Sequence, residues 1–325
     1  NLVGSWRILQ RVASHRWTTD DLVTSYMAGR EFIEYFSSQR KPIRYLDLGC
    51  GNGSVLLMTT WQLLSKLQEQ GYNETVTTSC SGYAPLVCTG IEARNEAVQL
   101  ARRSIAFNVG NKESDDTTSN RPDTYNVNDN PLVQADVKVH HGDFRSVLDN
   151  LSEMDFDLVT GTPPYFRVDF TVEKGSDDDD IKTVQQAVIN QGGMPTCKQS
   201  APARCEFRGG VEAYCKAAAR AMHKFSVFCV CENWLNNDRV YQGAKDAGLV
   251  VVKVLPVQGR IGKPSPLFAV YVMRRRSFFE QEEDAITNTG IPETKVLDCL
   301  IVRDWKGNWT KEYKEILQAM SIPVF

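Results

Sequence analysis

A Pro-Pro pair followed by an aromatic residue is the part of the sequence that most directly suggests chemistry. Residues 162–165 read Thr-Pro-Pro-Tyr and come just after the apolar run 156–160. Two successive prolines fix an extended turn, so the aromatic side chain after them is held in place. The Thr162 hydroxyl and the Pro163 carbonyl could then accept the two N–H groups of an exocyclic amine, while Tyr165 stacks on the ring that carries it. Such orientation is what a conjugated, weakly nucleophilic nitrogen needs in order to react.

A glycine-rich turn indicates where a small ligand would approach the backbone. Residues 47–53 read Asp-Leu-Gly-Cys-Gly-Asn-Gly. This G-x-G-x-G spacing differs from the G-x-G-x-x-G of dinucleotide enzymes, and the turn lacks the Lys-Ser/Thr of a phosphate loop. The acid that begins the turn favours a cationic ligand bearing an amino acid, and S-adenosylmethionine, with its sulfonium and ammonium groups, fits that description. The candidate cofactor-binding residues here are Asp47, Gly49, Cys50, Gly51, Asn52 and Gly53.

Acidic residues also follow the next two predicted strands. Glu92 ends the apolar run 87–92, where its carboxylate could accept hydrogen bonds from both hydroxyls of a ribose. Asp143 and Phe144 follow the next run, where an acid could accept from an adenine amino group and a ring could pack on the base. A single acid at a strand end is often structural. Three such signals at successive strand ends favour one nucleoside site, which would include Ala93 beside Glu92.

Alternating strand and helix patterns predict the scaffold that positions these residues. Strand-like apolar runs alternate with helical patterns, which indicates βαβ units and a mostly parallel sheet with helices on both faces. The last two runs have no helix between them, so we expect an antiparallel pair at the sheet edge. The seven predicted strands are residues 44–48, 87–92, 137–140, 156–160, 226–231, 249–257 and 267–273. The predicted helices are residues 54–67, 95–107, 211–222 and 238–247.

Three polar stretches interrupt this alternation, at residues 71–85, 111–130 and 169–202. Their composition predicts surface insertions in one enlarged domain. The third follows the Pro-Pro-Tyr segment directly, so it is either an inert loop or a lid over the substrate. We therefore expect an N-terminal covering segment (1–43), an α/β domain (44–276) and a C-terminal extension packed on the core (277–325).

Length and composition exclude several classes of protein. The chain has 325 residues, 42% of them hydrophobic, which is enough for a large core and excludes global disorder. No apolar run approaches the roughly 18 residues of a membrane span. The nine cysteines and four histidines show no metal-ligand spacing, so we expect no metal and a reducing intracellular compartment. That compartment is the cytoplasm, or an organelle if a targeting peptide was removed. The oligomeric state is open, with a monomer favoured.

The net charge of −3 does not exclude a nucleic-acid substrate. Residues 111–130, 169–180 and 280–284 carry net charges of −3, −5 and −4, which leaves +9 on the rest of the chain. The overall figure therefore averages a basic core with acidic segments. We expect nucleic-acid affinity to rely on local basic patches rather than on the field of the whole protein.

The chain resembles the bacterial tRNA adenine-N6 methyltransferases that modify the adenine beside the valine-tRNA anticodon. Residues 162–165 are similar to the Asn/Asp/Ser-Pro-Pro-Tyr/Phe motif of amino-methyltransferases, with Thr162 as a departure. Residues 304–313 resemble that family's closing segment, Asp-x-x-Gly-x-x-Thr-x-Glu-Tyr, which is the most specific likeness. Residues 15–22 are similar to its N-terminal Lys/Arg-x-x-Thr-Asp segment, from which Arg16 and Thr19 carry over as cofactor-binding positions.

The resemblance implies a Rossmann-like class I methyltransferase that uses S-adenosylmethionine to methylate N6 of adenine in RNA, expected to be tRNA. It implies catalytic roles for Thr162, Pro163, Pro164 and Tyr165, with the target base extruded and stacked on Tyr165. Substrate-binding roles follow for Phe166, and for Arg260 and Lys263 in a turn that could meet RNA phosphates or could be an ordinary exposed basic turn. The alternatives are a protein-glutamine N-methyltransferase, and a cofactor- and RNA-binding scaffold that Thr162 has made inactive.

Overall fold

The computed structural model describes most of the chain outside its polar stretches. The described residues are 1–11, 16–35, 42–69, 86–109, 135–151, 154–166, 206, 209–280 and 290–324. The three predicted insertions, 71–85, 111–130 and 169–202, lie outside these residues. None of the helices in the described ranges is long and apolar enough to cross a membrane.

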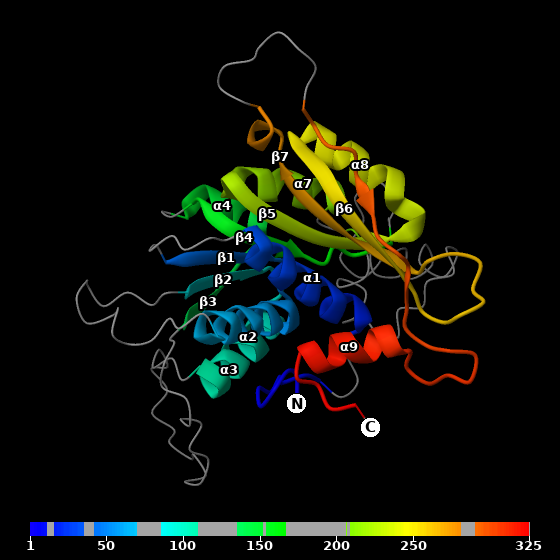
Figure 1. Cartoon of the computed structure of the whole chain (residues 1–325). Helices are drawn as coiled ribbons and strands as arrows, with labels where there is room; N and C mark the ends of the chain where they lie inside the picture. Colours follow the sequence, from blue (N-terminus) through cyan, green and yellow to red (C-terminus); the bar gives the residue numbers. More distant parts are fainter. Residues whose placement is uncertain are drawn as a thin grey trace, which may run out of the picture.

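A twisted sheet organises the chain, and the described residues contribute nine strands to it (Figure 1). The strand order is β3-β2-β1-β4-β5-β7-β6-β8, with β9 also pairing with β6. Strand β7 is antiparallel to both of its neighbours, and the other pairs are parallel. The strands are β1 Ile43–Leu48, β2 Leu86–Glu92, β3 Ala135–His141, β4 Phe156–Gly161, β5 Met222–Asn233, β6 Leu249–Gln258, β7 Phe268–Arg275, β8 Lys295–Val296 and β9 Leu300–Ile301.

The seven predicted strands are all present as β1 to β7, and the predicted mixed α/β class is confirmed. The expected antiparallel pair is present as β6 and β7, but it does not form the outermost edge of the sheet, because β8 and β9 pair with β6. The helical connection after β5 places β6 two positions away from β5 in the sheet. Strand β7 lies between them and is antiparallel to both. The short strands β8 and β9 then extend the sheet beyond β6.

Helices cover both faces of the sheet (Figure 1). One face carries α1, α2, α3 and α9, and the other carries α4, α7 and α8. Because successive strand residues point to opposite faces, Tyr45 joins the first core and Leu46 the second. The helices are α1 Thr19–Tyr35, α2 Ser54–Glu69, α3 Asn95–Val109, α4 Phe144–Asn150, α7 Val211–Ala221, α8 Asn237–Asp246 and α9 Lys311–Ala319.

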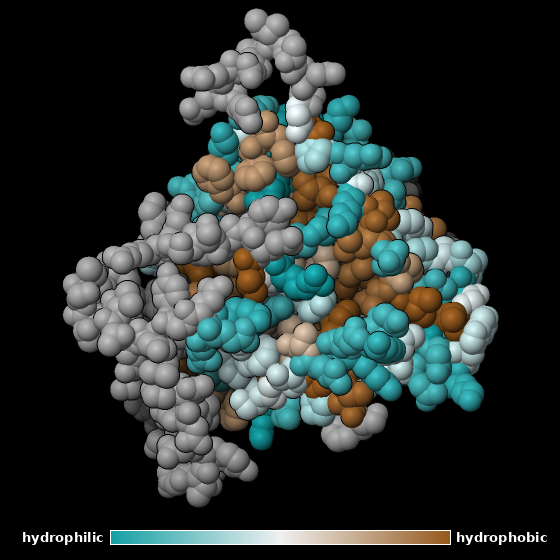
Figure 2. All heavy atoms as spheres, viewed as in Figure 1, coloured by the Kyte–Doolittle hydropathy of each residue, from teal (hydrophilic) through white to brown (hydrophobic). Residues whose placement is uncertain are grey.

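Both ends of the described chain pack on the same face of the sheet. Leu2 and Val3 are buried in the core formed with α1, α2 and α3, and so are Tyr313 and Leu317 of α9. Hydrophobic residues gather near the centre of the face shown in Figure 2, over β6 and β7, and hydrophilic residues surround them. Because Leu2, Val3 and α9 pack on this face, the terminal segments stabilise the side of the domain from which α1 reaches the carboxyl edge of the sheet.

Candidate active site

A cavity of about 530 Å³ lies where the carboxyl ends of β1, β2 and β4 meet the start of α1. This volume is within the usual range for small-molecule sites. The predicted residues that line it are Thr19, Gly49, Cys50, Gly51, Asn52, Glu92, Ala93, Asp143, Phe144, Thr162, Pro163, Pro164, Tyr165 and Phe166. The structure thus brings together five segments that were predicted separately. Their binding roles stay predictions.

The glycine turn owes its shape to backbone angles that other residues rarely adopt. Gly49 and Gly51 have φ of 64° and 59°, in the left-handed region that favours glycine. A Cβ at Gly49 would lie 2.3 Å from the Tyr214 hydroxyl oxygen. Gly53 does not line the cavity, and a Cβ there would lie 3.4 Å from that of Ala101 on α3. The first two glycines therefore shape the cavity, while Gly53, with φ of 88°, takes the left-handed backbone angle just before α2.

Asp47 lies beneath the turn rather than in the cavity. Its side chain is buried, and its Oδ1 accepts a hydrogen bond of 2.7 Å from the Thr160 hydroxyl. The same Thr160 oxygen lies 2.7 Å from the Tyr45 hydroxyl. Burial raises the pKa of Asp47 to about 7. The contacts of Asp47 are therefore those of a group that joins β1 to β4.

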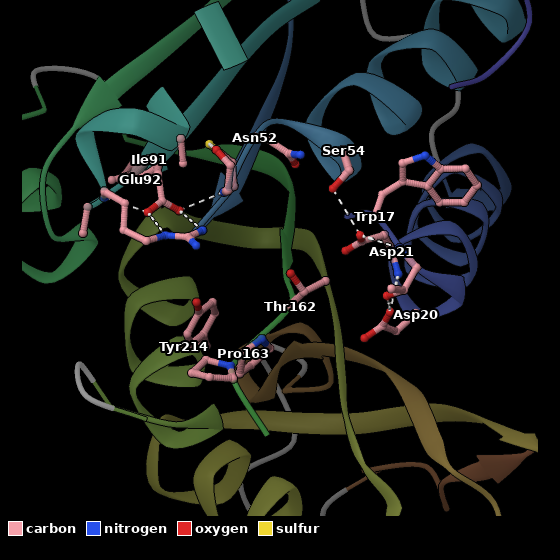
Figure 3. Close-up of a pocket in the computed structure, with 18 of the residues that line it drawn as sticks. Trp17, Asp20, Asp21, Asn52, Ser54, Ile91, Glu92, Thr162, Pro163 and Tyr214 are labelled. Carbon is pink, nitrogen blue, oxygen red and sulfur yellow. Dashed lines mark hydrogen bonds and ion pairs between the residues drawn. The ribbon is translucent and has the colours of Figure 1, made fainter. Parts of the chain in front are cut away.

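Glu92 joins the glycine turn to the end of β2. Its Oε2 accepts a hydrogen bond of 2.9 Å from the Gly51 amide, and its Oε1 accepts bonds of 2.7 and 2.8 Å from the amide and Nε of Arg94 (Figure 3). The Arg94 Nη2 also lies 3.3 Å from Oε2. The carboxylate is only 4% exposed. The predicted ribose acceptor is therefore already an ion-pair partner of the cavity-lining Arg94, which the sequence reasoning missed.

Asp143 is the N-cap of α4. Its Oδ1 accepts a hydrogen bond of 3.0 Å from the Arg145 amide, and its two oxygens accept bonds of 2.9 and 2.6 Å from the Arg145 guanidinium. Phe144 is buried and packs edge-on against Tyr214, with ring centroids 4.7 Å apart. Together Phe144 and Tyr214 form an aromatic wall of the cavity. Tyr214 comes from α7, and nothing in its sequence context indicated this position.

The Thr-Pro-Pro-Tyr segment leaves β4 and crosses the cavity. Figure 3 shows Thr162 between Glu92 on one side and Asp21 on the other. The Tyr165 hydroxyl donates a hydrogen bond of 2.8 Å to Asp20 Oδ2, and the Asn236 side-chain amide donates one of 3.3 Å to the Tyr165 carbonyl. Burial raises the pKa of Tyr165 well above its ordinary value. The aromatic residue predicted to stack on a base is thus held at both its ring end and its backbone.

The start of α1 adds two carboxylates that the sequence reasoning did not select. Asp21 Oδ2 accepts hydrogen bonds of 3.1 Å from the Thr18 amide and 3.2 Å from the Ser54 hydroxyl. Burial, and then the nearby Asp20 charge, raise the pKa of Asp21. The Thr18-x-x-Asp21 spacing is a capping-box pattern, which could have indicated this helix start. Trp17 lines the cavity beside these residues.

Besides Asp47 and Gly53, three further predicted residues lie outside the cavity lining. Arg16 is exposed just before α1. Arg260 and Lys263 are exposed in the turn after β6, where the Arg260 guanidinium donates hydrogen bonds to the carbonyls of Asp304 and Trp305. Among the described residues, no group of three or more His, Cys, Asp or Glu side chains is placed to hold a metal ion.

Comparison with known proteins gives distant structural likenesses only. No family model and no curated protein matches the chain. The fold is similar to a predicted O-methyltransferase from Agrobacterium tumefaciens, at 11% identity over 94% of this chain and 98% of the other, with a TM-score of 0.47. It is similar to a precorrin-6y C5,15-methyltransferase from Geobacter metallireducens, at 11% identity over 82% and 93%, with a TM-score of 0.41.

A third likeness is to the methyltransferase subunit of a type I restriction-modification system from Streptococcus thermophilus. The identity is 13%, the match covers 94% of this chain and 53% of the other, and the TM-score is 0.43. At these identities and TM-scores the likenesses do not assign an activity. What this chain does has to be argued from its own cavity.

Proposed function

We propose that the protein is an S-adenosylmethionine-dependent methyltransferase that modifies N6 of adenine in RNA, with tRNA as the expected substrate. The observation that carries this proposal is the convergence of the glycine turn, Glu92, Asp143 and the Thr162–Tyr165 segment on one cavity. The first three suit a nucleoside cofactor, and the fourth suits a planar amine. A shared cavity is what direct transfer between the two requires.

The residues of the cavity fit a cationic nucleoside. The left-handed turn at Gly49 and Gly51 leaves backbone without side chains facing the cavity, so a ligand can approach it closely. Asp20 and Asp21 lie on one side of this space, and on the other side Glu92 is paired with Arg94. The acidic groups at the start of α1 favour a ligand bearing positive charge. In the proposal Glu92 receives the ribose hydroxyls, Asp143 and Phe144 the adenine, and the turn with Thr19 the amino-acid end. S-adenosylmethionine would supply an electrophilic methyl group.

The target base would meet the segment after β4. The Thr162 hydroxyl and the Pro163 carbonyl would accept hydrogen bonds from the exocyclic amine, which orients its lone pair. Tyr165 would stack on the base, and its bonds to Asp20 and Asn236 would hold the ring in place before the base arrives. Phe166, which also lines the cavity, would extend this surface. Arg260 and Lys263 would contact the RNA backbone outside the cavity.

Cofactor binding and transfer to a base are tested separately. Isothermal titration of the protein with S-adenosylmethionine measures the first, and we expect Glu92→Ala to abolish the signal. Incubation with methyl-labelled cofactor and either total RNA or total protein measures the second, and nucleoside analysis of the labelled RNA should give N6-methyladenosine. A protein without measurable cofactor affinity would remove the whole proposal. Label in the protein fraction alone would instead support glutamine methylation.

Thr162 gives one specific reason to keep a non-enzymatic alternative. Its single short hydroxyl stands where related motifs have Asn, Asp or Ser, so the chain could bind cofactor and RNA without transfer. The Thr162→Asn variant separates the two readings. An active wild type excludes the scaffold, whereas activity that appears only in Thr162→Asn supports it.

A further inference from the structure

Two turns at the carboxyl ends of β6 and β9 are hydrogen-bonded into one rigid surface, which we call the double-turn platform (residues 258–263 and 303–308). The Ile261 amide donates a bond of 2.8 Å to the Arg303 carbonyl. The Arg260 guanidinium donates to the Asp304 and Trp305 carbonyls, at 3.2 and 2.7 Å. In Figure 1 these turns lie next to each other at the right of the molecule.

The second turn of the platform is also fixed internally. The Asp304 carboxylate accepts hydrogen bonds of 2.8 and 2.9 Å from the amides of Lys306 and Asn308. The Arg303 guanidinium donates one of 2.7 Å to the Gly307 carbonyl. The Asn308 side-chain amide also donates a bond of 3.2 Å to the Asp304 carboxylate. The hydrogen bonds to this carboxylate lower the pKa of Asp304, and the one from the Asn308 side chain contributes most. The carboxylate keeps its negative charge, and its hydrogen bonds hold the second turn in shape.

Trp305 is displayed by this platform. Its side chain is 70% exposed, although a buried position is usual for so large an apolar ring. It lies against Gly262, since a Cβ added there would come within 2.3 and 2.4 Å of its six-membered ring atoms. Glycine at this position, with φ of 81°, therefore makes room for the ring. An aromatic side chain held on a rigid turn and left open to solvent is suited to stacking on a flat partner.

Cations surround the exposed ring. Arg260, Lys263, Arg303 and Lys306 all belong to the platform and are all exposed, against the single carboxylate of Asp304. An exposed aromatic ring among cations matches the chemistry of single-stranded nucleic acid, which offers bases for stacking and phosphates for charge. An acidic peptide would satisfy the cations but would leave the ring without a flat partner.

The platform lies on the same edge of the sheet as the cavity. Strand β6 runs parallel to β4 and is three strand positions away in the sheet order, roughly 14 Å at about 4.8 Å per strand. The loop that begins at Arg260 ends at Leu267, which lines the cavity and is itself 62% exposed. A strand of two or three nucleotides spans such a distance, so one nucleic acid can reach both places.

We propose that the double-turn platform binds single-stranded RNA beside the target nucleotide, with Trp305 stacking on an unpaired flanking base and Lys263 and Lys306 contacting phosphates. The inference rests on the proposed function for its choice of RNA. Arg260 acts mainly as a support, because its guanidinium holds the turn that carries Trp305.

The test measures RNA affinity apart from catalysis. A fluorescein-labelled single-stranded RNA containing one adenine is titrated with wild type, Trp305→Ala, Trp305→Phe and Phe225→Ala, and cofactor affinity is measured on the same samples. Phe225 is the matched control, since it is an exposed aromatic residue near the amino end of β5, on the opposite edge of the sheet. We expect Trp305→Ala to weaken RNA binding about tenfold, with Trp305→Phe keeping most of the affinity. Phe225→Ala should match wild type, and all four should bind cofactor equally.

Ultraviolet crosslinking gives a second readout, in which the labelled RNA should be found on the peptide that contains Trp305. Equal RNA affinity of Trp305→Ala and wild type, or no RNA affinity in wild type, would overturn the inference. If Trp305→Ala and wild type bind RNA equally while cofactor binding is intact, the inference is refuted but the proposed methyltransferase function is not. Loss of all cofactor binding in wild type refutes that function instead, while a Trp305 crosslink would still support the RNA surface.

Discussion

Two strand ends of this molecule carry the same local pattern and use it differently. Glu92 and Arg94 lie at the end of β2, and Asp143 and Arg145 lie just after β3. In each case the acid accepts hydrogen bonds from the amide and the guanidinium of the arginine two residues on. The first pair is inside the molecule, with side-chain exposures of 5% and 28%. The second is near the surface, with exposures of 22% and 52%.

The difference lies in what else each carboxylate holds. Glu92 also accepts the Gly51 amide, so it fixes the glycine turn against β2 as well as pairing with Arg94. Asp143 caps the short helix α4. A buried carboxylate that joins two segments costs more to remove than a partly exposed cap, because its donors are left unpaired away from water. The sequence pattern acid-x-Arg alone therefore does not predict how much removal of the acid costs.

The largest expected effect follows from removing these acids in turn. Glu92→Ala should weaken S-adenosylmethionine binding by at least about 100-fold, since it removes the proposed ribose acceptor and releases the glycine turn. It should also lower the free energy of unfolding by about 3 kcal/mol, because Arg94 loses its buried partner. Asp143→Ala should weaken cofactor binding by less than about tenfold. Calorimetric titration and urea unfolding measure the two quantities.

Asp149→Ala serves as the control for this pair of variants. Asp149 is on α4 and pairs with Arg220, both side chains being largely exposed and outside the cavity lining. Its loss should leave cofactor affinity unchanged. If Asp143→Ala proved as damaging to binding as Glu92→Ala, burial would not be what separates the two sites.

A buried carboxylate that is bonded to no arginine among the described residues extends the comparison to the effect of pH. Glu232 ends β5, where its Oε1 accepts bonds from the Asn233 amide and the Asn236 side chain, while no donor among the described residues reaches Oε2. Burial raises its pKa to about 8. The folded state therefore holds a proton that the unfolded state releases above about pH 4.5. This contribution to stability is complete at low pH and is lost as the pH rises toward 8.

Glu232→Gln should remove that dependence. Between pH 5 and pH 7.5 the wild type should lose about 3 kcal/mol more of its free energy of unfolding than the variant does. Urea unfolding at several pH values measures the difference, and the Asp47 contribution cancels because both proteins keep it. Parallel pH profiles for the two proteins would mean that Glu232 is ionised in the fold.

Arg94 tests whether the buried ion pair competes with the cofactor. Its guanidinium occupies two of the acceptor positions on Glu92 and places a positive charge in the cavity. Arg94→Met should therefore increase S-adenosylmethionine affinity by a small factor, about threefold. It should also lower the stability of the ligand-free protein by about 3 kcal/mol, because the buried Glu92 carboxylate loses its partner. Arg145→Met, whose guanidinium is outside the cavity lining, should leave the affinity unchanged. A marked loss of affinity in Arg94→Met would show that the guanidinium itself binds the ligand.

The sequence predicts what is local in this structure. Apolar runs bounded by glycine or polar residues gave the strands, because burial on both faces of a central sheet requires them. The three strand-end signals met in one cavity, because parallel strands bring their carboxyl ends to one edge. The Thr162–Tyr165 segment joined them for the same reason, since β4 is the neighbour of β1.

What the sequence did not predict depends on contacts between distant residues. The hydrogen bond between Tyr165 and Asp20 spans 145 positions, and no periodic pattern in the sequence predicts it. The inward position of Tyr214 follows from how α7 packs. The Glu92–Arg94 pair is a local exception, because its residues are only two positions apart and the sequence reasoning still missed it. Arg260 looked like a free phosphate contact, but its guanidinium supports a turn 45 residues later. The position of β7 between β5 and β6 likewise depends on where the connection after β5 places β6 in the sheet.

The smallest expected effect separates the two roles of Asp143, as the cap of α4 and as the ion-pair partner of Arg145. Arg145→Gln removes an exposed guanidinium but leaves the Arg145 amide bonded to the cap, so it should cost at most about 0.5 kcal/mol of unfolding free energy, and less in high salt. Asp143→Ala removes the cap and should cost about 1 kcal/mol at any salt concentration. Urea unfolding at low and high salt measures both. Equal, salt-sensitive losses would instead assign the stabilisation to the ion pair, and the surface site would then differ from Glu92 only in degree.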